Sequence, residues 1–279
     1  MADTAFQTQY RQEFIAGFEE GQSLLRSSVV TEAVIKGNTA TFLVADSGGA
    51  TATTRGVNGL ITARADNLTQ SSATLAEWHD LVRKTNFNIF ASQGDQRRIM
   101  QETTMKVINR KIDADIIAQL DTATIDTGTT TTASVAMVAK ALAALGNAEV
   151  PIEDEDNMFA AVTPGFWAYL MQTREFASGE YVDVKLFSGA IKKFWRWFGV
   201  NWIRHPNLSG VGTSTELCYL YHRDALGHAA DTGGLDSLVG YDGEQAYSWA
   251  RCSVHMGSKL LQNTGIVQMK HDGSAFALT

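Results

Sequence analysis

The segment FLVADSGGATATTRGVNGLITARADNLTQ, from Phe42 to Gln70, constrains the fold of this chain more than any other feature. Its middle consists mainly of Gly, Ala, Thr, Ser and Asn, with no proline and no periodic apolar face, and it is too long for an ordinary connection inside a compact domain. The flanking stretches, Ala33–Asp46 and Leu68–Asn88, are rich in β-branched and aromatic residues, which predicts strands. A two-stranded ribbon alone is marginally stable in water, so we expect a long β-hairpin that is supported by something outside itself.

Composition and charge limit the class of protein. The chain has 279 residues, of which 44% are apolar and 9% aromatic, enough material for the core of a globular protein. Its formal net charge of -7 argues against a general affinity for nucleic acid, because binding to the phosphate backbone depends on clustered Lys and Arg. The chain is therefore not expected to grip DNA or RNA tightly.

Neither a membrane span nor a secretory signal is expected. The most apolar stretch, Ala133–Leu145, is shorter than the ~20 residues of a membrane helix and contains Lys140. The opening MADTAFQTQYRQEF lacks a basic flank followed by an apolar run, so we expect synthesis in the cytosol. Cys218 and Cys252 have no CxxC spacing and are predicted to be reduced thiols in the core.

The first thirty residues carry aromatic side chains four positions apart: Phe6, Tyr10, Phe14 and Phe18. This spacing places neighbouring rings on one face of a helix. Two interpretations stand side by side. The helix docks on the core of its own chain, or it is an arm that buries its rings on a neighbouring subunit.

A long helix is predicted from about Ser92 to Thr122. Ser92, with Asp95 three positions later, resembles a capping signal in which the acid lies in the first turn. Apolar or small residues then recur at helical spacing, at Ile99, Thr103, Ile108, Ile112, Ile116 and Leu120. At ~1.5 Å per residue such a helix is roughly 40 Å long. The opposite face is basic, with Arg97, Arg98, Lys106, Arg110 and Lys111. A solvated or inter-subunit surface is the favoured interpretation of this face, and a stripe that binds nucleic acid is the alternative.

A polar linker, TATIDTGTTTTAS, separates this helix from a region of different character. There we expect a helix that ends at Gly146, a solvated acidic turn at Glu153–Asp156, a buried strand, and a helix that begins near Phe166 after the turn Thr163-Pro164-Gly165. A metal site is the alternative for the acidic turn, although it lacks the glycine and the spaced ligands of a calcium loop. Further strands close the chain around a turn at Asn263–Gly265.

Aromatic and basic residues alternate in IKKFWRWFGVNWIRHP, which includes Trp195, Trp197 and Trp202. This composition fits a strand at an interface between subunits. A platform on which a single nucleic-acid strand stacks is the alternative.

Signatures of catalysis and nucleotide binding are missing. The sequence contains no GxGxxG, Walker-type, GxSxG or HExxH motif, and the glycines between residues 48 and 59 are followed by neither Lys-Ser/Thr nor a helix signal. The six histidines are scattered, and a triad that involves His79 has nothing to mark it. We therefore expect no catalytic residue, no cofactor and no metal.

The order of these segments resembles the major capsid protein of tailed bacteriophages, whose fold is named after phage Hong Kong 97. Local stretches are similar too: AVTPGFWAYLMQTREF resembles the strand-turn-helix segment of the family's axial domain, and SKLLQNTGIVQMKHD its closing hairpin. The opening ADTAFQTQYRQEFIAGFE, with EAVIKGNTATFLVADSGGATATTRGVNG, resembles a subgroup found in podophages and siphophages. The resemblance covers nearly the whole chain, in loose patterns and not in chemical signatures.

This resemblance implies an α+β, Hong Kong 97-like capsid fold. It implies an N-terminal arm at 1–35, an extended loop at 36–80, a peripheral domain with a long spine helix at 81–124, an axial domain at 125–215, and closing strands at 216–279 that return to the peripheral domain. The implied subunit-interface residues are Phe6, Tyr10, Phe14, Phe18, Arg55, Arg64, Trp195, Trp197 and Trp202.

The resemblance also implies a partner set. Subunits form pentamers and hexamers of an icosahedral shell that encloses double-stranded DNA, and the short arm implies a separate scaffolding protein, besides a portal and a decoration protein. The protein is then part of the virion capsid, made and assembled in the cytoplasm of the bacterial host. The founding member cross-links its subunits through a lysine of the loop, but here the only loop lysine is Lys36 at the base, which predicts non-covalent closure.

Two other functions stay open at this point. An encapsulin-type compartment shares the fold and loads enzymes in place of a genome. An α+β enzyme would use the long loop as a lid over its active site, and it would need a convergent set of acid, base or nucleophile.

Overall fold

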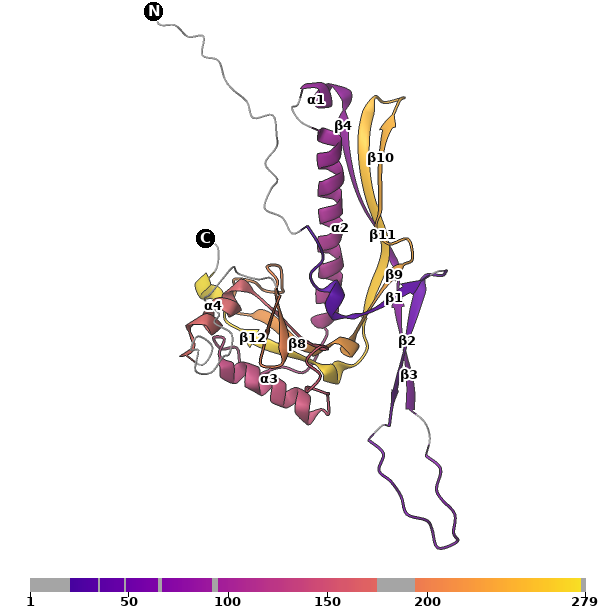
Figure 1. Cartoon of the computed structure of the whole chain (residues 1–279), viewed down its shortest axis with the longest axis vertical. Helices are drawn as coiled ribbons and strands as arrows, with labels where there is room; N and C mark the ends of the chain where they lie inside the picture. The colour runs from indigo at the N-terminus through magenta and orange to yellow at the C-terminus, as the bar shows by residue number, and fades with distance from the viewer. Residues whose placement is uncertain are drawn as a thin grey trace, which may run out of the picture. The chain divides into compact units, whose positions relative to one another are not determined.

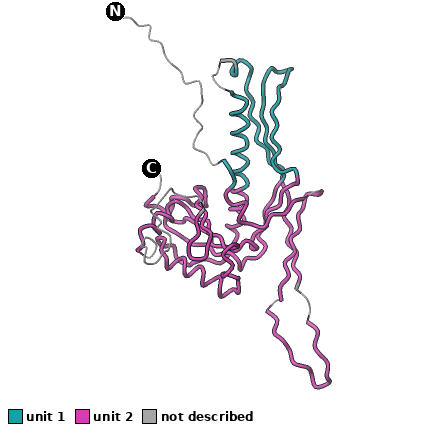
Figure 2. The backbone as a smooth tube through the Cα atoms, viewed as in Figure 1, with its two compact units in different colours: residues 1–23, 77–112, 233–255 teal, residues 24–76, 113–232, 256–279 magenta. Residues whose placement is uncertain are grey.

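The computed structural model describes residues 21–34, 36–47, 49–64, 67–91, 95–174 and 194–276. The chain divides into two compact units (Figure 2). Unit 1 comprises residues 1–23, 77–112 and 233–255, and unit 2 comprises residues 24–76, 113–232 and 256–279. Among the described residues, no helix combines the length and the apolar character needed to cross a membrane.

Unit 1 is built from strands and the first part of the long helix. Its elements are β4 (Ala76–Thr85), α1 (Asn86–Ala91), α2 (Gln96–Leu120), β10 (Asp236–Asp242) and β11 (Tyr247–Leu260), of which α2 and β11 also supply residues to unit 2 (Figure 1). Strand β11 pairs with β10 in antiparallel register and also with β4. The backbone N–H of Arg98 donates to Asp95 Oδ1 at 3.2 Å, so Asp95 caps α2 from the position before its first residue, and not from within the first turn as predicted. Ser92, the other half of the predicted capping signal, lies outside the described residues.

The basic face of α2 contacts the strands of its own unit. Lys111 Nζ lies 3.8 Å from the centroid of the Trp78 ring, and Arg97 donates to Ser248 Oγ at 3.3 Å. These contacts are a cation–π interaction and a hydrogen bond. Part of the predicted solvated or inter-subunit face therefore holds the helix against its own sheet.

Unit 2 contains a five-stranded sheet in the order β12-β8-β5-β7-β6. Its strands are β5 (Met158–Val162), β6 (Phe194–Trp197), β7 (Val200–Arg204), β8 (Glu216–His222) and β12 (Ile266–His271), accompanied by α3 (Val135–Asn147) and α4 (Pro164–Gln172). Every residue of β5 is buried. The predicted strand-turn-helix is confirmed, because Thr163 Oγ1 accepts the Phe166 N–H and Pro164 occupies the first turn of α4.

Strand β9 (Leu226–Asp231) lies between β1 (Val30–Val34) and the end of β11, parallel to the first and antiparallel to the second. Short 3-10 turns lie at Arg26–Ser28, Arg223–Ala225, Asn263–Gly265 and Ser274–Phe276. The strands after residue 216, which were expected to return to the peripheral domain, belong to two sheets. Strands β8 and β12 pair within the sheet of β5, whereas β9, β10 and β11 form the other sheet. Sequence spacing alone did not distinguish these partners, because the pairing of each strand depends on residues far away in the chain.

The predicted long hairpin is present in unit 2. Strand β2 (Thr39–Asp46) pairs in antiparallel register with β3 (Asn67–Thr74), and residues 47–66 connect them; we call residues 39–74 the extended hairpin (Figure 1). These two strands form a sheet of their own. The hairpin is therefore the marginal two-stranded ribbon that the sequence predicts.

Support for the extended hairpin comes from β9 and β11. Buried Phe42 packs with Ala40, Ala73 and Ala229, and a Cβ added to Gly227 would lie 2.7 Å from the Phe42 ring. A Cβ on Gly257 would meet the Thr74 carbonyl oxygen even more closely. Two strands outside the ribbon thus carry glycines where its base approaches them.

We predict that Gly227→Ala destabilises the protein by about 1–3 kcal/mol, because the added methyl group overpacks the Phe42 ring. The free energy of unfolding in urea measures the effect. Gly146→Ala is the matched control. Its Cβ would meet the Ile152 side chain at an ordinary 3.5 Å, and alanine favours the helix, so no loss of stability is expected.

The same substitution in a Phe42→Ala background should cost much less, because the ring that the methyl group strikes is gone. An equal cost in both backgrounds would contradict this account of the hairpin base.

Candidate assembly surfaces

The extended hairpin exposes apolar side chains along its length. All described residues from 49 to 64 are exposed. Five large apolar residues of the hairpin are among the exposed ones: Leu43 (77%), Val57, Leu60 (73%), Ile61 (67%) and Leu68 (67%). Single exposed apolar residues are normal on a protein surface, but here they gather on one projecting element.

The two faces of the ribbon differ. Leu43 is opposite Gln70 and Ala45 is opposite Leu68, so Leu43 and Leu68 project from the same face. Phe42 projects from the other face, into the cluster at the hairpin base. At the base, the face that carries Phe42 is therefore covered by the rest of unit 2, whereas the face that carries Leu43 and Leu68 is exposed.

The two loop arginines were predicted to contact a neighbouring subunit. In the structure Arg55 Nη1 donates to the Gly59 carbonyl at 3.0 Å, and Arg64 Nη1 donates to the Ser47 carbonyl at 3.3 Å. Both are exposed. Because a guanidinium has five N–H donors, one bond to the loop leaves each arginine able to bind a further acceptor.

The four predicted rings of the arm, Phe6, Tyr10, Phe14 and Phe18, lie outside the described residues. The chain is described from Gly21 onward. Residues 21–29, which we call the arm base, therefore provide the structural information on this segment.

The predicted aromatic strand forms the β6–β7 hairpin. Its turn residues Phe198 and Gly199 have φ of 56° and 71°, as a two-residue type I′ turn requires. Trp202 is 1% exposed and its Nε1 donates to the Trp197 carbonyl at 3.0 Å. Trp202 was predicted at a subunit interface, but it is a core residue of unit 2 and has almost no surface left for a neighbour.

The other two tryptophans are half-buried. Trp195 meets Trp167 edge to face at 4.5 Å between ring centroids, and it stacks on Trp197 at 6.4 Å. These rings contact one another, as buried aromatic pairs do, and are not spaced as open platforms for nucleic-acid bases. Trp195 and Trp197 remain predicted contact residues.

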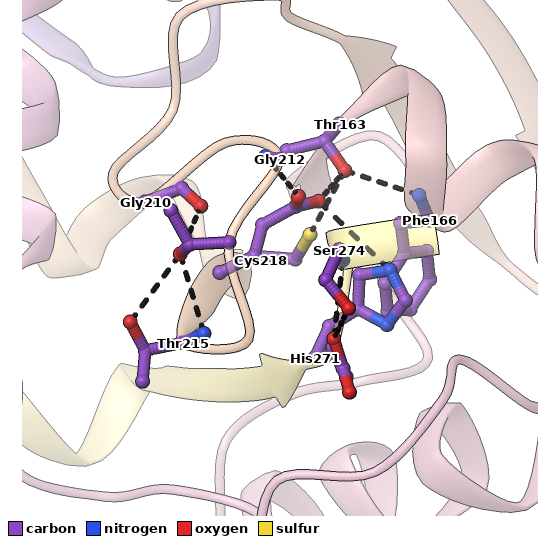
Figure 3. Close-up of polar contacts among 11 residues, drawn as sticks. Thr163, Phe166, Gly210, Gly212, Thr215, Cys218, His271 and Ser274 are labelled. Atoms are coloured by element: carbon purple, nitrogen blue, oxygen red, sulfur yellow. Dashed lines mark hydrogen bonds and ion pairs between the residues drawn. The ribbon is translucent and has the colours of Figure 1, made fainter. Parts of the chain in front are cut away.

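A buried polar cluster that sequence analysis missed includes Thr163, Gly212, Cys218 and His271, which are labelled in Figure 3. The acid of this cluster is Glu216. Its carboxylate accepts hydrogen bonds from Thr163 Oγ1 and, at 2.9 Å, from the Gly212 N–H, and His271 Nε2 lies 4.0 Å away. Cys218 Sγ is 3.9 Å from Thr163 Oγ1. No sequence motif marks this cluster, because its members come from β8, β12 and the residue before α4.

The chemistry of the cluster indicates a structural role. Glu216, Thr163, Cys218 and His271 are all buried, so a substrate has no access to them. Burial raises the pKa of the Cys218 thiol to about 12, which keeps it protonated and unreactive at neutral pH. Within the described ranges, no group of three His, Cys, Asp or Glu side chains could hold a metal ion.

The described residues line two surface hollows. One, of about 260 Å³, is lined by the threonines 127, 129 and 131 and by Lys140. The other, of about 150 Å³, is lined by His222, Pro151 and Gln262 among others. Both are below the ~300–1,000 Å³ that is typical of small-molecule pockets. In the described part of the chain, neither resembles an active site.

Comparison with known proteins gives one consistent result. The family model described as "Phage capsid protein" matches residues 2–273. No curated protein matches the sequence.

Solved structures of phage capsids have the same fold. The structure of Mycobacterium phage Che8 is 14% identical, with a TM-score of 0.74, and the match covers 96% of this chain and 98% of that one. The cyanophage Pam1 capsid is 11% identical over 98% of both chains, with a TM-score of 0.70. The capsid of cyanophage P-SCSP1u is 13% identical over 96% of this chain and 93% of that chain, with a TM-score of 0.69. The predicted Hong Kong 97-like α+β fold is confirmed.

The buried histidines predict how stability depends on pH. Burial lowers the pKa of His271, with the Glu216 charge opposing it, and burial also lowers the pKa of His228. An unfolded histidine binds a proton below about pH 6.5, whereas these native side chains resist it. We therefore expect the free energy of unfolding to be constant from pH 8 to 7 and to fall by up to about 1.4 kcal/mol per pH unit for each group below about 6.5.

Urea denaturation at half-unit intervals of pH from 8 to 5.5 measures this slope, and His271→Gln should make it shallower. A slope that is the same in both proteins, or a stability that rises on acidification, would refute the assignment.

Proposed function

Because the chain belongs to the phage capsid protein family, we propose that its copies associate as pentamers and hexamers into the closed icosahedral head that encloses double-stranded DNA. The protein is a structural component of the virion capsid. Its function in this proposal is repeated contact between identical subunits, and no residue acts as a catalyst.

The observation that carries the proposal is the exposed apolar surface of the extended hairpin. Leu43, Leu60, Ile61 and Leu68 are all at least two-thirds exposed. Burying one such side chain against another subunit contributes about 1.5–3 kcal/mol. Shape complementarity over a wide interface then adds to these contacts, so the shell needs no single strong site.

Other contacts of the proposal follow the chemistry of the exposed groups. Arg55 and Arg64 keep N–H donors for acidic or carbonyl acceptors of a neighbour. The arm residues Phe6, Tyr10, Phe14 and Phe18 would bury their rings on another copy, and Trp195 and Trp197 would extend the surface of the β6–β7 hairpin. The net charge of -7 suits a container that encloses DNA without gripping it.

Partners outside the chain are part of the same proposal. A scaffolding protein would guide assembly, a portal would occupy one vertex, and a decoration protein would bind the finished shell. Synthesis and assembly would take place in the cytoplasm of the host.

The alternatives account for fewer observations. An enzyme with a lid needs accessible acid, base or nucleophile groups, whereas the Glu216 cluster is buried. An encapsulin-type compartment has the same fold, and the family match favours the phage head over it.

Deletion of residues 48–64 is predicted to leave a soluble, folded subunit that no longer forms closed shells. The deletion removes the exposed loop and leaves the packing around Phe42 intact. Circular dichroism reports folding, and negative-stain microscopy with the scaffolding partner reports shells. Normal shells from the deletion variant would disprove the role of the loop.

Point substitutions separate apolar contact from loop length. Leu60→Asp with Ile61→Asp should abolish shells, because two buried carboxylates would replace apolar contacts. Thr51→Asp with Thr53→Asp adds the same charge at exposed positions of the same loop and is the control. Equal loss of assembly in both pairs would show that charge, and not the apolar contact, is responsible.

Shell closure without covalent cross-links is a further prediction. Lys36 is the only lysine of residues 36–80, and it lies at the base of the extended hairpin, away from the exposed loop. Denaturing electrophoresis of mature particles should give one band near the subunit mass of 30.3 kDa. A ladder of multimers would contradict the prediction.

A further inference from the structure

A buried carboxylate in the middle of α2 binds the arm base. Asp113 is 2% exposed, and its two oxygens accept the backbone N–H groups of consecutive residues. Leu24 N–H donates to Oδ2 at 3.0 Å and Leu25 N–H to Oδ1 at 3.1 Å. Both leucines are buried, so water does not compete for these bonds.

His205, just after β7, holds the carboxylate in place. Its Nδ1 accepts the N–H of Asn207 at 3.1 Å, which assigns the ring hydrogen to Nε2. Nε2 lies 3.2 Å from Asp113 Oδ2 and therefore donates to it. Asp113 thus accepts hydrogen bonds from three N–H groups, which stabilise its buried charge in place of water.

The rest of the arm base is fixed to β8 and the turn that follows it. Ser28 is fully buried, and its hydroxyl lies 2.5 Å from the hydroxyl of Tyr221. Arg223 Nη2 donates to the Ser27 carbonyl at 2.7 Å. Hydrogen bonds from α2, β8 and the turn after β8 therefore hold Leu24, Leu25, Ser27 and Ser28, and three of these four residues are held through their backbone.

A buried charge needs a reason, because an apolar side chain of similar size could pack beside the two leucines at a lower desolvation cost. An apolar side chain cannot accept two consecutive backbone N–H groups. The pair of bonds fixes the direction of the peptide chain at Leu24, which packing of side chains does not do.

We propose that Asp113 is a positioning residue that fixes the backbone direction of the arm base at Leu24 and Leu25, and so selects the neighbour that the arm reaches. The second half of this proposal rests on the proposed function, since it assumes that the arm contacts another copy. The first half concerns the free subunit alone and is tested separately.

Hydrogen exchange of Asp113→Asn in the free subunit tests the first half. Asparagine has the same shape but only one carbonyl oxygen, so its NH2 group faces one of the two backbone donors. The amides of Leu24 and Leu25 should exchange at least about tenfold faster, while those of Val267 and Met269 in β12 stay within about twofold. Unchanged exchange at Leu24 and Leu25, or equal acceleration in β12, would overturn the proposal.

Two further variants test whether the faster exchange comes from the hydrogen bonds of Asp113. Asp121→Asn removes a carboxylate that accepts from Ser209 and Tyr219 at the end of the same helix, and it should leave Leu24 and Leu25 unchanged. His205→Asn keeps an acceptor for Asn207 but loses the donor to Asp113, so an intermediate acceleration is expected. If Asp121→Asn instead accelerated exchange at Leu24 and Leu25 as much as Asp113→Asn does, the acceleration would come from the loss of a negative charge near the end of α2, and not from the lost hydrogen bonds of Asp113. This result would overturn the proposal.

Negative-stain microscopy of assembled material tests the second half. Asp113→Asn should give open or irregular particles and at least about tenfold fewer closed shells than the wild type. Wild-type protein that forms no shells would refute the proposed function and leave the exchange result standing. Closed shells of normal yield from Asp113→Asn would refute the inference about the arm.

Discussion

The arrangement of unit 2 depends on one constraint: a two-stranded ribbon cannot support itself in water. The base of the extended hairpin is supported by β9 and β11: Phe42 lies against Gly227 of β9, and Thr74 lies against Gly257 of β11. Support at the base fixes the ribbon but covers only one of its faces. The leucines of the other face and the loop beyond remain exposed, and in the proposed shell the next copy would cover them.

Buried carboxylates have a comparable role inside the subunit. Asp113 accepts two consecutive backbone N–H groups of the arm base, and Glu216 joins the start of α4 to the loop before β8. Charge-assisted bonds of this kind fix the backbone more firmly than apolar packing does. In the proposed shell, such bonds would give the projecting segments fixed attachment points. Asp113 and Glu216 are both buried.

Local patterns in the sequence predicted local structure well and long-range pairing poorly. The spacing of apolar residues predicted the long helix, and Thr163-Pro164-Gly165 predicted that a helix follows β5, because each depends on neighbours within a few residues. The exact first residues differ: α2 begins at Gln96, directly after Asp95, and α4 begins at Pro164 and not near Phe166. Which sheet β8 and β12 join, and why Trp202 is buried, depend on partners far along the chain. Asp113 and Glu216 gave no signal, because an acid within a helix or strand usually faces solvent. Leu60 and Ile61 were not singled out either, because the segment around them has no periodic apolar face; the structure shows that nothing in the described chain covers them.

The central claim is that the body of the subunit is complete on its own and that the exposed loop becomes covered only on assembly. Hydrogen exchange of the free subunit and of assembled shells tests this most directly. The account predicts equal protection of β5, β8 and β12 in both states, and strong protection of residues 49–64 only in shells. A loop that is already protected in the free subunit, or that stays unprotected in shells, would contradict it.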